Sequence, residues 1–124
     1  MDKIYLSWDE YVEKVNAICL WAKDKNFSGV YGVPRGGLIP SVMISHCLSI
    51  SYIDDSYAHI WPKKNILVVE DAIDTGSSVK DFKDDYRVSS IATISKHVDC
   101  SFEPDFYAMT HSKWLVFPYE KENK

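Results

Sequence analysis

The first third of the chain carries two apolar patterns with helical spacing. Ser7 and Glu10 have the spacing of a capping box, in which each end of the motif satisfies a free backbone N–H of the other. Apolar residues then recur every three or four positions, at Trp8, Tyr11, Val12, Val15, Ile18, Cys19 and Ala22. This periodicity predicts a helix from about Trp8 to Asp24.

A short strand and a second helix are expected next. The apolar run Val30 to Val33 lies between Gly29 and Pro34, which is typical of a buried strand. After a loop at 34–37, the apolar residues of the segment Leu38 to Leu48 return at mostly helical spacing. Its proline lies in the first turn, where a helix tolerates one. The pattern therefore predicts a helix over this segment.

The second half of the chain reads mainly as strands. The aliphatic run Ile66 to Val69 is typical of a central parallel strand that is covered on both faces, with Glu70 and Asp71 at its carboxyl end. A loop from Asp74 to Ser78 is expected to lead into a helix through Tyr86. Alternating stretches predict the remaining elements, namely a hairpin or two edge strands at Ser49–Asp54 and Tyr57–Trp61, and further strands of the same sheet at Val88–Lys96, Asp105–Met109 and Trp114–Phe117.

The alternation of strands and helices predicts an α/β fold with a parallel sheet, whose ligands bind beyond the carboxyl ends of the strands. The length of 124 residues, with 46% hydrophobic and 26% charged residues, indicates a single folded domain over residues 1–124. The three cysteines form no C-x-x-C pair and are expected to be buried thiols. The four histidines have no metal-ligand spacing, so we interpret them as surface or ordinary packing residues.

Charge and hydropathy narrow the range of partners. A net charge of −4, with lysines and arginines scattered along the chain, gives no basic stripe for nucleic acid. The sequence has no apolar stretch long enough to cross a bilayer, and its first residues lack the apolar core of a signal peptide. We therefore expect a cytoplasmic protein that binds neither nucleic acid nor membrane.

The most informative stretch runs from Ile66 to Ser78. Adjacent carboxylates such as Glu70 and Asp71 suit the hydroxyls of a ribose, or a hydrated Mg²⁺ beside them. The small residues from Asp74 to Ser78 let several backbone N–H groups converge on a phosphate, with hydroxyl donors and a following helix N-terminus adding to them. Neither a Walker loop nor a dinucleotide-binding glycine fingerprint is present.

This stretch resembles the phosphoribosyl-pyrophosphate (PRPP) motif of the type I phosphoribosyltransferases, in which aliphatic residues and two acids precede D-T-G and small residues. The resemblance assigns the 5′-phosphate to Asp74, Thr75, Gly76, Ser77 and Ser78, and the ribose and Mg²⁺ to Glu70 and Asp71. The segment Val33 to Pro40 is similar to the family's pyrophosphate loop, in which Arg35, Gly36 and Gly37 would hold the leaving group. A cis peptide before Arg35 is implied as well.

Two stretches agree with the purine branch of the family, the xanthine-guanine and hypoxanthine enzymes. They are the segment Val33 to Pro40 and the base-binding end, formed by Lys96 and the segment Trp114 to Glu120. Lys96 corresponds to a lysine that meets the 6-oxo group of the base, while Trp114 would stack on the ring and Leu115 would offer its carbonyl. Asp74 is assigned to the N7 side of the purine, as the catalytic residue. The resemblance spans most of the chain and implies transfer of phosphoribosyl from PRPP to guanine, xanthine or hypoxanthine with Mg²⁺, in a homodimer or tetramer.

The resemblance also implies a fold: a Rossmann-like, mostly parallel sheet flanked by helices. One departure concerns the lid, or hood, of the purine enzymes, a long mobile hairpin that often begins with Ser-Tyr. Here Ser56 and Tyr57 are followed by only eight residues before Ile66, so the lid is expected to be reduced. This shortness supports a second possible function, a non-catalytic sensor of PRPP or a nucleotide that has the same fold. A third possibility, independent of the lid, is an enzyme that acts on a pyrimidine or another nucleophile.

Overall fold

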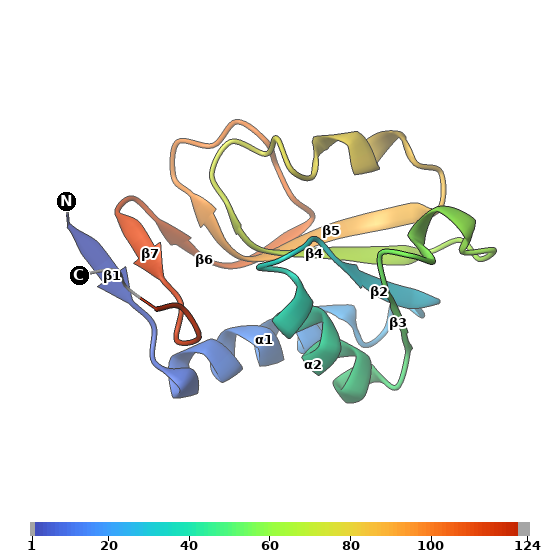
Figure 1. Ribbon diagram of the computed structural model, residues 1–124, viewed down its shortest axis with the longest axis horizontal. Coiled ribbons are helices and arrows are strands. Elements are labelled where there is room, and N and C mark those ends of the chain that lie inside the picture. Colours follow the sequence, from blue (N-terminus) through green and yellow to red (C-terminus); the bar gives the residue numbers. More distant parts are fainter. Residues whose placement is uncertain (1, 122–124) are drawn as a thin grey trace.

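The computed structural model describes residues 2–121 and contains two parallel sheets (Figure 1). The larger sheet has five strands in the order β3-β2-β4-β5-β6, and the smaller pairs β1 with β7. In chain order the elements are β1 (Lys3–Tyr5), α1 (Trp8–Ala22), β2 (Gly29–Gly32), α2 (Leu38–Leu48), β3 (Ser51–Ile53), η1 (Ala58–Ile60), β4 (Ile66–Ile73), η2 (Lys80–Asp84), β5 (Val88–His97), β6 (Phe106–His111) and β7 (Trp114–Val116), where η marks a 3₁₀ helix. The predicted α/β fold with a parallel sheet flanked by helices is confirmed.

Helices α1 and α2 cover one face of the larger sheet (Figure 1). The predicted capping box starts α1, because the backbone N–H of Glu10 donates to Ser7 Oγ at 3.1 Å and that of Ser7 donates to Glu10 Oε1 at 2.9 Å. The buried positions of α1 follow the predicted periodicity, at Tyr11, Val15, Ile18, Cys19 and Ala22. Helix α1 ends two residues before the expected Asp24, and α2 has the predicted bounds.

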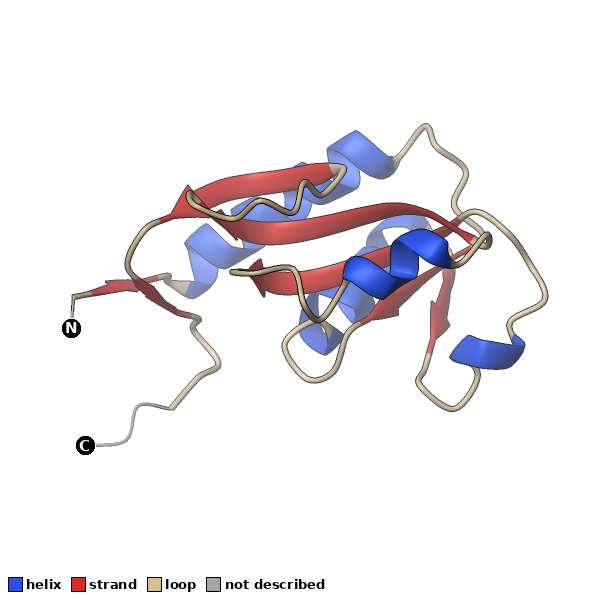
Figure 2. Ribbon diagram, turned by 90° about the horizontal axis from the view of Figure 1, so that it is seen from above, coloured by secondary structure: helices blue, strands red, loops and turns tan. Residues whose placement is uncertain are grey.

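The opposite face of this sheet is covered by η1, η2 and loops (Figure 2). The predicted helix from the 74–78 loop through Tyr86 is wrong, since only the five residues of η2 are helical there. Val79 and Phe82 are the sole apolar residues of 79–85 to pack on the sheet, too few to hold a full α-helix against it. Beyond them, Arg87 donates to both carboxylate oxygens of Asp85 at 3.1 and 2.8 Å and turns the chain into β5.

The segment between α2 and β4 also differs from the prediction. Only β3 is a strand, and it pairs in parallel with β2, so there is no hairpin. Asp54 ends this strand because its carboxylate accepts hydrogen bonds from the backbone N–H groups of Ser56 and Tyr57 at 2.8 and 3.2 Å, which turns the chain. The predicted strand Tyr57–Trp61 is a turn and η1 instead.

The small sheet is a feature that the sequence did not predict. β7 was expected to close the main sheet, but it pairs with β1, with Lys3 opposite Trp114 and Tyr5 opposite Val116. The two strands lie beyond the end of the main sheet (Figure 1). Partners more than a hundred residues apart leave no periodic signal in either three-residue segment.

Two strands of the main sheet run further than expected. β4 continues through Ile73, and Ile73 lies opposite Lys96 of β5, so the acid pair is inside the strand and not at its end. β6 runs two residues past the predicted Met109 and places His111 opposite His97. The chain adds β3 on one side of β2 and then crosses to the other side to form β4, so the strand order reverses between β2 and β4. The crevice beyond the carboxyl ends of two such strands is where α/β folds bind ligands.

Candidate functional site

The loop after β2 is packed tightly against the end of β4. The backbone N–H of Val33 donates to the carbonyl of Val69 at 3.0 Å, and that of Gly37 donates back to the carbonyl of Val33 at 2.8 Å. The peptide between Pro34 and Arg35 is cis, as the resemblance implies. The Arg35 side chain is exposed and makes no hydrogen bond or ion pair within residues 2–121, so it is available to an anion.

Gly36 brings this loop into direct contact with the acid pair. A Cβ at Gly36 would lie 2.2 Å from Asp71 Oδ2 and 2.4 Å from Oδ1, closer than a carbon atom can approach. Because glycine has no Cβ, the backbone of the loop can approach the carboxylate at this position. The predicted pyrophosphate loop and the predicted ribose-binding acids are thus brought together.

The two acids occupy different environments, because consecutive strand residues face opposite sides of a sheet. Glu70 is only 7% exposed, and its carboxylate accepts hydrogen bonds from Ser78 Oγ at 3.1 Å and from the backbone N–H of Asp71 at 3.0 Å. Burial, and then the negative charge of Asp71, raise the pKa of Glu70 to about 8. Glu70 therefore ties the strand to the 74–78 loop.

Asp71 is half-buried and is held by a residue that sequence reasoning missed. Its Oδ1 accepts a hydrogen bond from the backbone N–H of Ala72 at 2.7 Å, and its Oδ2 accepts one from the Tyr119 hydroxyl at 2.8 Å. Burial, and then the charge of Asp71, raise the pKa of Tyr119, so this hydroxyl keeps its proton. Tyr119 lies 48 positions further along the chain, which left no local signal.

The donor set fits a magnesium ion that is shared with a substrate. Among residues 2–121 no group of three or more His, Cys, Asp or Glu side chains could hold a metal alone. Mg²⁺ needs only one or two carboxylates when water and phosphate oxygens complete its coordination. Of the two acids, Asp71 is the hard oxygen donor that lines the cleft, and a cation beside it would offset the negative charge that, together with burial, raises the pKa of Glu70.

The loop at 74–78 exposes the donors expected of a phosphate site. Gly76 adopts a φ of +85°, a conformation that glycine takes without strain. The hydroxyl of Thr75 donates to Ser77 Oγ at 3.2 Å, and the backbone N–H groups of Thr75, Gly76 and Ser78 donate to no described residue. Because η2 and not an α-helix follows, the expected helix N-terminus adds nothing, and the loop itself must supply the donors.

A cleft of about 510 Å³ opens beside this loop. Asp71, Asp74, Trp114 and Leu115 line it, and so do residues that the sequence did not single out, among them His97, His111 and Lys113. Trp114 is 59% exposed, so its ring is available for stacking. Of the predicted purine-binding residues, Lys96 does not line the cleft, since its ammonium pairs with Glu103 at 3.2 Å.

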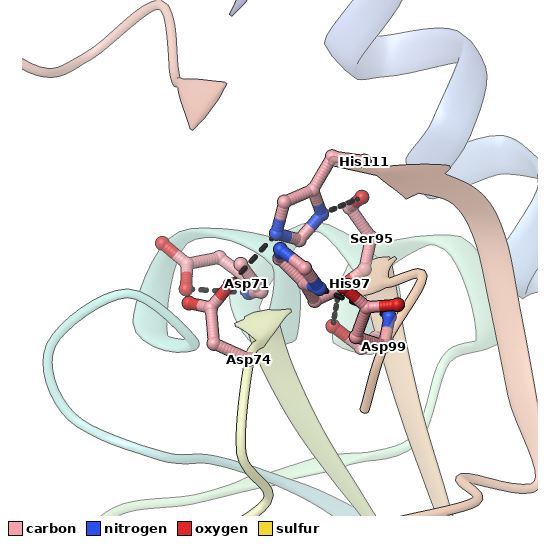
Figure 3. Close-up of polar contacts among 8 residues, drawn as sticks. Asp71, Asp74, Ser95, His97, Asp99 and His111 are labelled. Atoms are coloured by element: carbon pink, nitrogen blue, oxygen red, sulfur yellow. Dashed lines mark hydrogen bonds and ion pairs between the residues drawn. The ribbon is translucent and has the colours of Figure 1, made fainter. Parts of the chain in front are cut away.

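His111 connects Asp74 to the interior (Figure 3). Its Nε2 lies 2.8 Å from Asp74 Oδ1, and its Nδ1 lies 2.5 Å from the hydroxyl oxygen of the buried Ser95. The ring of His97 packs edge-on against it, with 5.3 Å between the centroids. The burial of His111 agrees with the sequence prediction of a surface or ordinary packing residue, but its contact with Asp74 was not predicted, because it depends on the two extra residues of β6.

Comparison with known proteins gives a consistent picture, although no protein-family model matches the chain. The xanthine-guanine phosphoribosyltransferase of Chromohalobacter salexigens is 26% identical over 133 residues, which cover 93% of this chain and 82% of that protein. The crystal structure of a purine phosphoribosyltransferase from Pyrococcus horikoshii superposes with a TM-score of 0.84 at 28% identity and covers 100% of this chain and 97% of its own. The xanthine-guanine-hypoxanthine enzyme of Helicobacter pylori has the same fold, with a TM-score of 0.76 at 15% identity over 94% and 92% of the two chains.

The fold and the sequence motifs agree with these relatives. The loop after β2, the acid pair in β4 and the small-residue loop that follows it meet at one crevice, in the order that the resemblance required. These three relatives, found by sequence or by structure, are all named phosphoribosyltransferases, and each aligns with nearly the whole chain. The chain is therefore similar, in sequence and in fold, to the purine phosphoribosyltransferases over nearly its whole length.

Proposed function

We propose that the protein transfers the 5-phosphoribosyl group of PRPP to an oxopurine base, namely guanine, xanthine or hypoxanthine, and releases pyrophosphate. The observation that carries this proposal is the cleft itself, in which Asp74 and the exposed ring of Trp114 face the same space as Asp71. A base that stacks on Trp114 would lie beside the carboxylates that suit a ribose. The names of the relatives support a purine as that base.

PRPP would bind across the crevice between β2 and β4. The free guanidinium of Arg35 and the backbone around Gly36 and Gly37 would hold the pyrophosphate. The unused N–H groups and hydroxyls of the loop 74–78 would surround the 5′-phosphate. Asp71, with Glu70 behind it, would accept hydrogen bonds from the ribose hydroxyls.

Mg²⁺ held beside Asp71 and Glu70 would neutralise charge that develops on the leaving pyrophosphate. The reaction forms a bond between N9 of the base and C1′ of the ribose while the bond from C1′ to the pyrophosphate oxygen breaks. Asp74 would accept the proton on N7, which is lost from the base as N9 becomes bonded. Its exposed carboxylate and its place in the cleft suit this role.

Three residues would select the base. Trp114 would stack on the ring, and the backbone carbonyl of Leu115 would accept a hydrogen bond from an N–H of the purine. Lys96 remains our candidate for the 6-oxo group, since an ammonium donates to an oxo group and cannot accept from an amino group. To reach the base it would have to leave Glu103, which is itself exposed at the surface.

The shortened segment before β4 does not cover the cleft, so a lid over the cleft would have to be supplied by another part of the protein. Within this segment, Ala58 and His59 line an apolar cavity together with Ile66 and Val88, at the amino ends of β4 and β5. Water exclusion normally relies on a lid that closes over the reacting atoms. A second copy of the chain in the expected homodimer or tetramer would supply that cover. A cytoplasmic location also remains our expectation.

The test is pyrophosphate release with Mg²⁺ and PRPP, run in parallel with guanine, xanthine, hypoxanthine, adenine and uracil. We expect release with at least one oxopurine and a loss of turnover of about 10²-fold or more in Asp74→Asn, the size of a general-base contribution. Asp74 is exposed and asparagine keeps an oxygen that can accept from His111 Nε2, so this variant should unfold close to the wild-type temperature. Binding of PRPP without turnover on any base would contradict the proposal and favour the sensor, and turnover with uracil alone would favour a pyrimidine enzyme.

A further inference from the structure

We propose that His111 is a positioning residue for Asp74, acting through a hydrogen-bonded chain from Ser95 through His111 to Asp74. The inference rests on the proposed function, because it takes Asp74 as the group that meets the base. It adds a residue for which the motifs of the chain assign no role. It also connects the ends of three neighbouring strands, since Asp74 directly follows β4, Ser95 belongs to β5 and His111 ends β6.

The three side chains differ in burial in a way that suits this task. The side chain of Asp74 is 63% exposed, and its contact with His111 is the single hydrogen bond that it makes to another described residue. The side chain of His111 is 3% exposed, and Ser95 is fully buried. An exposed carboxylate is therefore attached to a ring that packing holds in one place (Figure 3).

The proton positions follow from the groups present. An ionised carboxylate only accepts hydrogen bonds, so the proton of the Asp74 contact belongs to His111 Nε2. In the neutral ring Nδ1 is then an acceptor, and the hydroxyl of Ser95 donates to it. The Asp74 carboxylate thus fixes the Nε2–H tautomer, and the Ser95 hydroxyl supplies the hydrogen bond that the other ring nitrogen needs. His97, the other ring at this end of the sheet, accepts at its own Nδ1 from the backbone N–H of Asp99 at 3.0 Å.

The consequence for the reaction is a prearranged acceptor. With Oδ1 of Asp74 held by His111, Oδ2 is left for the N7 proton of the base. An unattached aspartate on an exposed loop would sample several rotamers, and displacement of a reacting group by about 1 Å can cost about 10²-fold in rate. Loss of His111 should therefore lower kcat far more than it raises the KM for PRPP, because His111 is not among the groups proposed to bind PRPP and of Asp74 it holds only the side chain.

The experiment compares His111→Leu, which removes both ring nitrogens, with His111→Gln, whose amide keeps an N–H donor of similar reach. We expect His111→Leu to lower kcat with the best oxopurine by about 10- to 100-fold, with less than a threefold change in the KM for PRPP, and His111→Gln to recover at least part of the loss. His46→Gln, an exposed histidine near the end of α2, is the matched control and should behave as wild type. Thermal unfolding of each variant shows whether it is folded.

A double-mutant cycle with Asp74→Asn separates positioning from general damage. If His111 acts through Asp74, then His111→Leu should cost little further kcat once Asp74 has been replaced. An equal loss in both backgrounds, or a loss confined to the KM for PRPP, would overturn the proposal while leaving the proposed function intact.

Nitrogen NMR of the histidine rings gives a readout that does not depend on turnover. We expect the His111 ring to be the Nε2–H tautomer in the wild type, and its Nε2 signal to shift in Asp74→Asn, with the His46 signals unchanged. A ring that is Nδ1–H, or insensitive to Asp74, would overturn the hydrogen-bonded chain itself. Wild-type protein that turns over no base would instead overturn the proposed function, and with it the role given to the chain.

Discussion

Replacement of Gly36 by alanine tests whether the loop after β2 and the acid pair act as one site. The new Cβ would lie 2.2 to 2.4 Å from three atoms of the Asp71 carboxyl group. To restore ordinary contact the carboxyl would have to move by about 1 Å. It is held by Tyr119 at 2.8 Å and by the backbone N–H of Ala72 at 2.7 Å, so this movement breaks or stretches at least one of these hydrogen bonds.

The magnitude follows from these contacts. A hydrogen bond to a charged group contributes about 1.5–3 kcal/mol, and an extra methyl group in a packed site costs about 1–3 kcal/mol. Because about 1.4 kcal/mol corresponds to a tenfold change, we expect kcat/KM for PRPP to fall by about 10- to 100-fold. The free energy of unfolding should fall by about 1–3 kcal/mol, the range for overpacking.

The assay is pyrophosphate release as a function of PRPP concentration, with urea unfolding of the same samples. Gly29→Ala is the matched control, since its Cβ would meet the flexible end of Ile53 at 2.8 Å at the opposite end of β2. That variant should lose stability and keep the wild-type KM for PRPP. A Gly36→Ala protein with unchanged kinetics, or two variants with the same kinetic defect, would refute the reasoning.

The remaining predictions concern the cleft and the acid pair. Trp114→Ala should raise the KM for the base about tenfold or more and leave the KM for PRPP within twofold, as initial rates with each substrate varied would show, because stacking on an aromatic ring is worth about 1–3 kcal/mol. Tyr119→Phe removes the hydroxyl that orients Asp71, so titration with Mg²⁺ at fixed PRPP should show a weaker response of about three- to tenfold. Lys96→Ala should lower kcat/KM for oxopurines and not PRPP binding, whereas Glu103→Gln should preserve oxopurine use; equal rates in Lys96→Ala and wild type would remove Lys96 from the site.

Much of the fold was predictable because local patterns carry it. The capping box and apolar face of α1, the bounds of α2 and the aliphatic start of β4 are properties of short windows in which each residue's neighbours are known. The motif at Ile66–Ser78 and the loop at 34–37 were recognisable for the same reason, since each is continuous in sequence. Their meeting at one crevice follows from parallel strands whose carboxyl ends share an edge.

Local patterns failed where neighbouring segments decided the outcome. The hydroxyl residues and acids of 74–86 suit a helix start, but too few apolar residues follow to pack a helix on the sheet, and η2 formed instead. The sequence of β7 is compatible with a strand in either sheet, and its pairing with β1 places it in the small one.

The sequence by itself therefore determined the parallel α/β framework and the residues that we propose for PRPP, because alternation, glycine placement and acid pairs act within a few positions. Tertiary structure decided how those residues are used. It placed Tyr119 on Asp71 and His111 on Asp74, and it paired Lys96 with Glu103. The physical reason is that a hydrogen bond depends on distances of a few tenths of an ångström, which only the packing of whole strands and helices sets.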